Sequence, residues 1–278
     1  MLKQILLPLA VAPMVLAASW TTTNTATTTP TTFAAATTTH SAYSTALTPQ
    51  QTTRVNELVD QYLRNNPKVV VDAIMAYRQA EITKFQAEVT HTIAQNKTAI
   101  FNTNNNLVLG NPRGDVTIVE FIDYRCGHCK AMAPVLKQAI QQDRNLKVVV
   151  KELPLFGGPS TFAAKAAIAA EKQSRFAKLH NFLMTTTTPL TQDSILKACK
   201  DLGINTRRLK ADIASQYVTN YVETNMNLAK TLKISATPTF IISKNNGEVN
   251  QYVPGAITLA QLQATIQAVR TNTTTTTR

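Results

Sequence analysis

The chain has 278 residues, a hydrophobic content of 44% and a formal net charge of +12. This length allows one medium domain and a smaller one, and the hydrophobic content is ordinary for a folded protein. The basic residues are dispersed and do not alternate with aromatic residues, which indicates a solvated surface and argues against binding to nucleic acid.

Residues 1–18 have the pattern of a secretory signal. Lys3 provides the basic start, an apolar segment follows, and small residues around Ala17 suit a cleavage site. The apolar segment is short and is interrupted by Pro8 and Pro13, so an uncleaved membrane anchor is the less favoured interpretation. We therefore expect the protein to be exported to the periplasm, an oxidising compartment.

A Thr-rich segment and a helical module follow. Residues 19–47 contain almost no charge and few large apolar groups, which predicts a disordered linker. Residues 48–103 form the predicted helical module. Its first helix begins with Thr48 as a cap, Pro49 at the first helical position and Gln51 at the position that completes a capping box.

The module contains two amphipathic helices. Their apolar positions are Val55, Leu58, Val59, Tyr62 and Leu63 in the first, and Val70, Ile74, Tyr77, Ile82, Phe85, Val89 and Ile93 in the second. Asn66 is the expected cap of the second helix, Pro67 leads it, and the helix could run to about residue 98. Because a long single-sided apolar stripe needs a partner, we favour an oligomerisation module over an accessory packing element.

Residues 104–272 alternate between strand and helix patterns and form the main domain. The expected elements are strands at 107–109, 116–122 and 146–151, a helical block at about 160–232, a strand after Pro238 that turns at 244–247 into a partner strand at 248–253, and a closing helix at 258–270. This order predicts an α/β fold with an inserted helical block.

Two cysteines lie where the strand 116–122 runs into a helix. Cys126 is at the helix N-terminus, where unpaired backbone N–H groups and the helix dipole favour a thiolate. His128 adds a basic group close by, and Cys129 lies within reach to form a disulfide. The spacing therefore predicts a redox-active dithiol.

Two other interpretations of the cysteine pair are weaker. Zinc would need a second ligand pair, but the only other cysteine is Cys199, and His40, His91 and His180 are scattered. A purely structural disulfide would close so short a loop that it would stabilise the fold little. We expect Cys199 to be a buried thiol on an apolar helix face and His180 to be a surface or packing residue.

Proline marks two further positions in the main domain. Pro134 lies inside the helix that follows the cysteines, where it removes a backbone hydrogen bond. Pro238 follows Thr237 at the start of an apolar strand, which suggests a cis peptide bond at the edge of the sheet.

These features together resemble the thioredoxin fold, and the helical block resembles the insertion of the DsbA family of exported thiol–disulfide oxidoreductases. The resemblance covers about residues 107–270. The phrases Phe-Ile-Asp-Tyr-Arg-Cys-Gly-His-Cys-Lys and Lys-Glu-Leu-Pro-Leu-Phe-Gly-Gly are most similar to the branch with an N-terminal helical extension. That branch includes Legionella- and Coxiella-type DsbA-like proteins and copper-sensitivity suppressor proteins. Its members assemble through the extension, which implies a homodimer or trimer through residues 48–103 here.

The resemblance implies roles for the residues of the candidate site. Cys126 would attack and form the mixed disulfide, and Cys129 would resolve it. His128 would stabilise the Cys126 thiolate. Thr237 and Pro238 would guide the substrate chain past the cysteines.

Glu120 matches the buried acid that the family has below the disulfide, and it could transfer the Cys129 proton. An ordinary strand carboxylate is the simpler interpretation, but an acid in so apolar a strand needs a reason. Lys151 is a candidate partner for Glu120.

The expected function is the formation or isomerisation of disulfide bonds in periplasmic proteins. The implied partners are reduced or misoxidised exported proteins and a membrane redox protein of the DsbB or DsbD type; the resemblance implies no cofactor and no metal. The Cys-Gly-His-Cys form departs from the Pro-His pair of the strongest oxidases and resembles disulfide isomerases, so the direction stays open. A reductase, a periplasmic Cu(I)-binding thiol protein and a holdase chaperone are the alternatives.

Overall fold

The computed structural model describes residues 46–101, 107–244, 247 and 249–271. The predicted signal and nearly all of the predicted Thr-rich linker lie outside the described residues. The chain divides into two compact units, residues 1–62 and 63–278, and each unit is described by itself.

Helix α1 (Pro49–Asn65) begins as the sequence predicts. The Thr48 backbone N–H donates to Gln51 Oε1 at 2.9 Å, and the Gln51 N–H donates to Thr48 Oγ1 at 3.3 Å. This is the expected capping box. Helix α1 contains no buried residue.

Helices α2 (Pro67–Gln95) and α3 (Lys97–Phe101) belong to the second unit. Asn66 is at the N-cap of α2, but its side chain makes no capping hydrogen bond, so that part of the prediction is wrong. The prediction of an apolar stripe on one side of the helix is also wrong for α2. Its exposed apolar residues include the consecutive residues 69–71, which cannot share one face of a helix.

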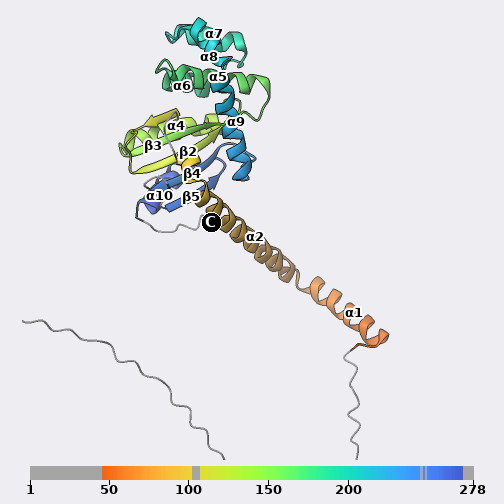
Figure 1. Ribbon diagram of the computed structural model, residues 1–278. Helices are drawn as coiled ribbons and strands as arrows, with labels where there is room; N and C mark the ends of the chain where they lie inside the picture. Colours follow the sequence, from red (N-terminus) through yellow and green to blue (C-terminus); the bar gives the residue numbers. More distant parts are fainter. Residues whose placement is uncertain (1–45, 102–106, 245–246, 248, 272–278) are drawn as a thin grey trace, which may run out of the picture. The chain divides into compact units, whose positions relative to one another are not determined.

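A five-stranded sheet forms the centre of the second unit (Figure 1). Its strands are β1 (Leu107–Gly110), β2 (Val116–Ile122), β3 (Leu146–Glu152), β4 (Thr239–Lys244) and β5 (Val249–Pro254), in the order β1-β3-β2-β4-β5. Strands β2 and β3 are parallel, and the other pairs are antiparallel. Strand β2 is central and all its residues are buried, as expected for an almost continuous apolar strand.

Strand β4 corrects one expectation. It lies between β2 and β5, in the interior of the sheet, so the cis peptide is not at an edge. The bond between Thr237 and Pro238 is cis, as predicted. Pro238 precedes the strand, so its missing N–H removes no hydrogen bond from the sheet.

Helices α4 (Gly127–Gln142), α6 (Phe176–Thr185) and α10 (Leu259–Arg270) pack on one face of the sheet, and α2, α3 and α9 (Gln216–Thr231) pack on the other. Helices α5 (Gly158–Glu171), α7 (Gln192–Asp201) and α8 (Thr206–Ile213) pack mainly against other helices. Ile118 and Ile122 of β2 join an apolar core with residues of α4, α6 and α10, whereas Val119 and Phe121 join a second core with residues of α2, α3 and α9. The run from α5 to α9, between β3 and β4, confirms the predicted helical block.

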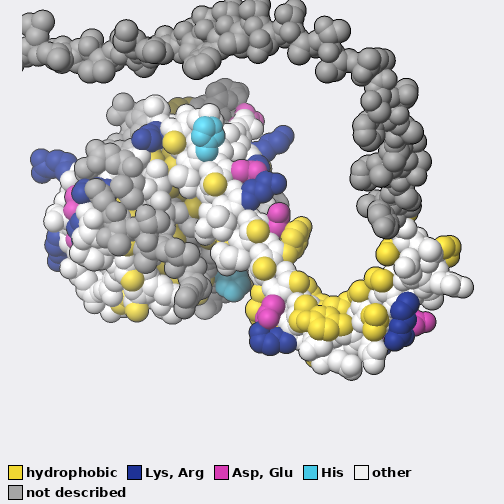
Figure 2. Space-filling model, turned by 90° about the horizontal axis from the view of Figure 1, so that it is seen from below, with side chains coloured by type: hydrophobic (Ala, Val, Ile, Leu, Met, Phe, Trp, Pro, Cys, Tyr) yellow, Lys and Arg dark blue, Asp and Glu magenta, His cyan; other side chains and the backbone are white. Residues whose placement is uncertain are grey.

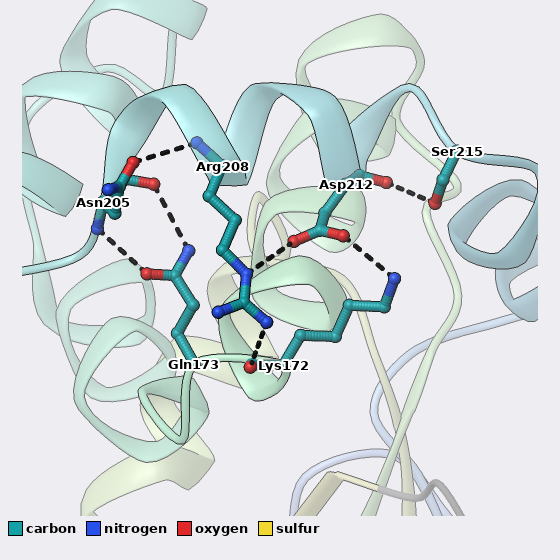
Figure 3. A network of polar contacts seen from close by, with 6 residues as sticks. All are labelled: Lys172, Gln173, Asn205, Arg208, Asp212 and Ser215. Carbon is teal, nitrogen blue, oxygen red and sulfur yellow. Dashed lines mark hydrogen bonds and ion pairs between the residues drawn. The ribbon is translucent and has the colours of Figure 1, made fainter.

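A polar network joins the end of α5 to α8 within this helical block (Figure 3). Lys172 forms an ion pair with Asp212 at 2.9 Å, and Arg208 donates to the Lys172 carbonyl oxygen at 3.2 Å. Gln173 accepts a hydrogen bond from the Asn205 N–H at 3.0 Å, and Asn205 caps α8. These contacts orient α8 against α5 at the surface of the helical block.

Candidate active site

Cys126 is the N-cap residue of α4. Its backbone N–H donates to the Asp123 carbonyl oxygen at 3.0 Å, and its thiol donates to the Thr237 carbonyl oxygen at 3.2 Å. Only 5% of Cys126 is exposed. The turn after β2 and the chain before β4 therefore hold the sulfur at the helix N-terminus, where the sequence places it.

The pKa of the Cys126 thiol is lowered by its neighbours. Burial acts in the opposite direction, but hydrogen bonds from Thr237, from the backbone N–H and thiol of Cys129 and from the backbone N–H of His128 outweigh it. Donors at a helix N-terminus stabilise a thiolate and make it a nucleophile.

Cys129 has the opposite character. It is fully buried, and burial raises the pKa of its thiol well above the ordinary value. Both cysteines are free thiols in this structure. One turn of helix therefore holds a sulfur that ionises easily beside one that retains its proton.

Thr237 lies beside both cysteines. Its hydroxyl lowers the pKa of Cys126 and of Cys129, and among the described residues this buried oxygen has no partner at full hydrogen-bond geometry. The chain before β4 therefore brings the hydroxyl and the carbonyl group of Thr237 to the sulfur of the candidate nucleophile.

The side chain of His128 is exposed on the first turn of α4, and its backbone N–H is the group that contacts the Cys126 sulfur. The structure thus places His128 at the site, with the backbone rather than the imidazole against the sulfur.

Glu120 lies on β2 with 2% of its surface exposed. Burial, with the charge of Cys126 as a second cause, raises the pKa of its carboxyl group to about 8. Glu120 and Cys129 line one cavity of about 380 Å³. At neutral pH this carboxyl group holds its proton close to the buried thiol.

Lys151 is not the partner of Glu120. Strand β3 pairs Lys151 with Phe121 and Val150 with Glu120, so Lys151 points to the opposite face of the sheet. Its ammonium group donates to the Ala99 carbonyl oxygen at 3.1 Å, and burial lowers its pKa to about 8. The sequence could not show this, because the face depends on strand register.

A buried polar chain lies beside the same cavity. The Tyr124 hydroxyl oxygen lies 2.8 Å from Glu152 Oε1 and 3.1 Å from His180 Nδ1. Since His180 also lines the cavity, it is more than the packing residue that the sequence suggests. The sequence does contain a sign of the role of Glu152, because an acid at the end of the apolar strand β3 is unusual.

Asp123 joins two loops at the site, a role that the sequence alone does not predict. Its carboxylate accepts hydrogen bonds from the N–H groups of Arg125, Leu155 and Phe156 at 2.7 to 3.1 Å and from the Ser160 hydroxyl at 2.8 Å. Leu155 and Phe156 are 40% and 50% exposed beside the site. The carboxylate therefore holds the loop after β3 against the turn that carries Cys126.

A family model for the DSBA-like thioredoxin domain matches residues 117–267 of the chain, which is more than half of its length. The match includes both cysteines, Glu120, the helical block and the Thr237–Pro238 peptide.

Solved structures of related proteins have the same fold. A thioredoxin-like oxidoreductase from Silicibacter pomeroyi is 34% identical, covers 63% of this chain and 97% of its own, and has a TM-score of 0.59. A linker-deletion mutant of Proteus mirabilis ScsC is 26% identical over 82% of this chain and 99% of its own, with a TM-score of 0.60. The thiol-disulfide exchange protein alpha-DsbA2 from Wolbachia pipientis is 26% identical over 64% and 94%, with a TM-score of 0.59.

Curated relatives are much longer proteins. The Na(+)/H(+) antiporter NhaA 3 of Salinispora tropica is 25% identical over 147 residues, which are 51% of this chain and 22% of that protein. The antiporter NhaA of Herminiimonas arsenicoxydans is 30% identical over 139 residues, which are 49% and 22%. The chain thus spans less than a quarter of the length of these relatives. No helix in the described part of the chain is long and apolar enough to cross a membrane.

Proposed function

Since the chain belongs to the family of DSBA-like thioredoxin domains, we propose that it is an exported thiol:disulfide oxidoreductase that forms or rearranges disulfide bonds in periplasmic proteins. The observation that carries this proposal is the position of the cysteine pair at the start of α4. Cys126 is the N-cap residue and its thiol contacts the Thr237 carbonyl oxygen at 3.2 Å, whereas Cys129 is fully buried. The pKa of Cys126 is lowered and that of Cys129 is raised accordingly.

The reaction follows from thiol–disulfide exchange. In the oxidising direction, a client thiolate attacks the Cys126 sulfur, the bond between Cys126 and Cys129 breaks, and Cys129 leaves as a thiolate that takes up a proton. A second client thiolate then attacks the client sulfur of the mixed disulfide. This forms the client disulfide and releases the Cys126 thiolate, which its neighbours stabilise.

The other directions use the same atoms. The Cys126 thiolate attacks a misplaced client disulfide, and either another client thiolate or Cys129 resolves the mixed disulfide. Each net oxidation of a client leaves two electrons on the enzyme, and each net reduction removes two. A membrane redox protein of the DsbB or DsbD type would restore the starting state.

Single substitutions at the two cysteines test the function. We expect Cys126→Ser to lose thiol exchange with reduced and with scrambled ribonuclease, because the nucleophile is absent. Cys129→Ser should retain the first step and accumulate a mixed disulfide with the client, which non-reducing electrophoresis detects. Cys199→Ser, which removes a buried thiol outside the site, is the matched control and should exchange at the wild-type rate.

Exchange that persists at the wild-type rate in Cys126→Ser would contradict the function. The redox state of the cysteine pair in the periplasm separates the directions: mostly oxidised protein indicates an oxidase, and mostly reduced protein indicates an isomerase or reductase.

The helical extension, residues 48–103, joins copies of the chain into a homodimer or trimer. Hydrophobic side chains lie on the surface along this extension (Figure 2). The exposed large apolar residues are Leu58, Val59 and Tyr62 of α1 and Val70, Ile74, Tyr77 and Ile82 of α2, among others. Such an accumulation of exposed apolar side chains marks an interaction site, and a second copy would cover the same residues on both partners.

A further inference from the structure

We infer that His180, Tyr124 and Glu152 form a proton relay that supplies a proton to Cys129 when the disulfide opens and takes it back when the disulfide closes. This inference rests on the proposed function, because the Cys129 sulfur gains and loses a proton only during thiol exchange. It adds three residues to the site and assigns a role in proton transfer to the buried Glu152.

Three elements bring the relay together. Glu152 is the last residue of β3, Tyr124 follows β2, and His180 lies in α6. The exposed fractions are 0% for Glu152, 1% for Tyr124 and 7% for His180. The oxygen–oxygen distance is 2.8 Å between Tyr124 and Glu152, and His180 Nδ1 lies 3.1 Å from the same phenolic oxygen. The contacts are short enough for proton transfer.

The chain has two arrangements, because the Tyr124 hydroxyl has one proton and two neighbours. With Glu152 ionised, Tyr124 donates to Glu152, His180 Nδ1–H donates to Tyr124, and Nε2 is an acceptor. With Glu152 protonated, the carboxyl group donates to Tyr124, Tyr124 donates to Nδ1, and Nε2 carries the proton. The second arrangement becomes the first when one proton moves along each contact and Nε2 releases its proton to an acceptor outside the relay; the tyrosine and the histidine are neutral in both arrangements.

The cavity beneath α4 connects the relay to Cys129. Its volume is about 380 Å³, and Cys129, Glu120 and His180 all line it. Since a water molecule occupies about 30 Å³ of liquid, this cavity has room for water between the imidazole and the sulfur. Glu152 Oε2, by contrast, is buried and has no hydrogen-bond partner among the described residues. Glu152 therefore reaches the cavity through Tyr124 and His180.

The transfer balances when Cys129 leaves as a thiolate. His180 Nε2–H gives its proton to the Cys129 sulfur through cavity water, Tyr124 gives its proton to Nδ1, and Glu152 gives its proton to Tyr124. Cys129 becomes a neutral thiol and Glu152 becomes a carboxylate. The same steps run backward when Cys129 attacks the mixed disulfide.

Burial sets the starting state of the relay. It raises the pKa of Glu152 well above the usual range and lowers the pKa of His180 to about 4, so both shifts favour the arrangement in which the carboxyl group holds the proton and the imidazole is neutral. The other titratable groups around the relay and the cavity are Glu120, Asp123, Cys126, Cys129, Lys137 and Tyr221. Among them, Glu120 is a second buried acid on the cavity wall.

The test is carried out in a Glu120→Gln background, so that Glu120 cannot replace the relay. The oxidised full-length protein is reduced with dithiothreitol, and acid quenching with mass spectrometry gives the rate. Tyr124→Phe removes the central proton carrier, and Glu152→Gln keeps a hydrogen-bonding side chain but removes the acid. We expect each to reduce the rate by about tenfold or more, and the double substitution to cost no more than one alone.

Buffer dependence separates proton transfer from a structural effect. In Tyr124→Phe and Glu152→Gln the rate should rise with the concentration of imidazole buffer, because an external acid then protonates Cys129. Tyr252→Phe, which removes a half-buried hydroxyl on the face of the sheet opposite Glu120, is the control and should resemble Glu120→Gln alone.

Two results overturn the relay: unchanged rates in both variants, or slower rates that do not respond to buffer. If either variant fails to fold, the other carries the test. An oxidised wild-type protein that exchanges with no client thiol would overturn the proposed function itself.

Discussion

The contrast between Cys126 and Cys129 comes from their positions on one turn of α4. Cys126 meets the free N–H groups of the helix start and the Thr237 hydroxyl, whereas Cys129 points into the protein, where charge is poorly solvated. A low pKa makes Cys126 both a good nucleophile and a good leaving group. The difference in pKa between the two cysteines therefore directs the attack of a client thiolate toward the Cys126 sulfur.

Removing the Thr237 hydroxyl should weaken this contrast. We expect Thr237→Val to raise the pKa of Cys126, because the thiolate loses a neighbouring hydroxyl that stabilises its charge. Thiolate absorbance at 240 nm during a pH titration measures the change. Thr265→Val is the control, since that hydroxyl donates to the Gln261 carbonyl oxygen in α10. A Cys126 titration curve that does not move would contradict the role of Thr237.

Glu120 should make the stability of the reduced protein depend on pH. Its pKa rises from 4.5 to about 8 on folding, so between these values the folded state binds a proton that the unfolded state releases. The unfolding free energy of the wild type should therefore fall by up to about 1.4 kcal/mol per pH unit as pH rises through this range. Glu120→Gln should lack this decline and gain stability relative to the wild type up to pH 8.

Urea unfolding at several pH values between 5 and 9 measures the difference between the two proteins. The titration of His180 is common to both and cancels in the comparison. A stability difference that stays constant with pH would show that the carboxyl group of Glu120 is not buried as the structure has it.

The loops around α4 are held by Asp123 rather than by the sheet. Its carboxylate receives backbone hydrogen bonds from both loops that border Cys126, and Arg125 donates to the Phe156 carbonyl oxygen at 2.6 Å. The exposed side chains of Leu155 and Phe156 are thereby fixed beside the nucleophile. A client chain would meet a preformed surface there.

Asp123→Ala should loosen this surface and destabilise the domain. It leaves the part-buried N–H groups of Leu155 and Phe156 and the buried hydroxyl of Ser160 without their acceptor, and we expect a loss of about 3 kcal/mol. Thermal unfolding measures the loss, and hydrogen exchange should become faster at the amides of Leu155 and Phe156. Asp193→Ala, an exposed carboxylate on α7, should cost less than about 1 kcal/mol. Equal effects of both substitutions would contradict the proposal that Asp123 holds the two loops together.

In the proposed assembly, the helical extension provides most of the exposed large apolar residues, and the domain built on the sheet provides the two cysteines. Helix α1 has no buried residue, and α2 buries only Val89 and Ile93. Copies that joined through these helices would present several Cys126 sulfurs to one client. Such an arrangement favours isomerisation, because the client stays bound while its disulfides rearrange.

The protein should be a dimer or trimer in size-exclusion chromatography with light scattering. Leu58→Lys and Ile74→Lys should shift it toward the monomer, because each places a charge in the proposed interface. Leu155→Lys, which changes an exposed apolar residue outside the extension, should leave the mass unchanged. A monomeric wild type at micromolar concentration would contradict the assembly.

Local patterns were enough to predict much of this protein. Apolar periodicity predicted the order of strands and helices, Thr48 and Gln51 predicted the start of α1, and the junction of strand and helix predicted the position of Cys126. Each of these features depends on residues that are close in the chain, where propensity and spacing act directly.

The contacts that complete the site depended on the packing of distant segments. The register of β2 and β3 placed Glu120 and Lys151 on opposite faces, and a shift of one residue would have reversed this. Helix α6 brought His180 to Tyr124, 56 residues away, and the chain before β4 brought Thr237 to Cys126, 111 residues away. The sequence thus determines which residue can act as the nucleophile, whereas tertiary packing decides which polar groups lie around the buried Cys129, because burial and register bring those groups together.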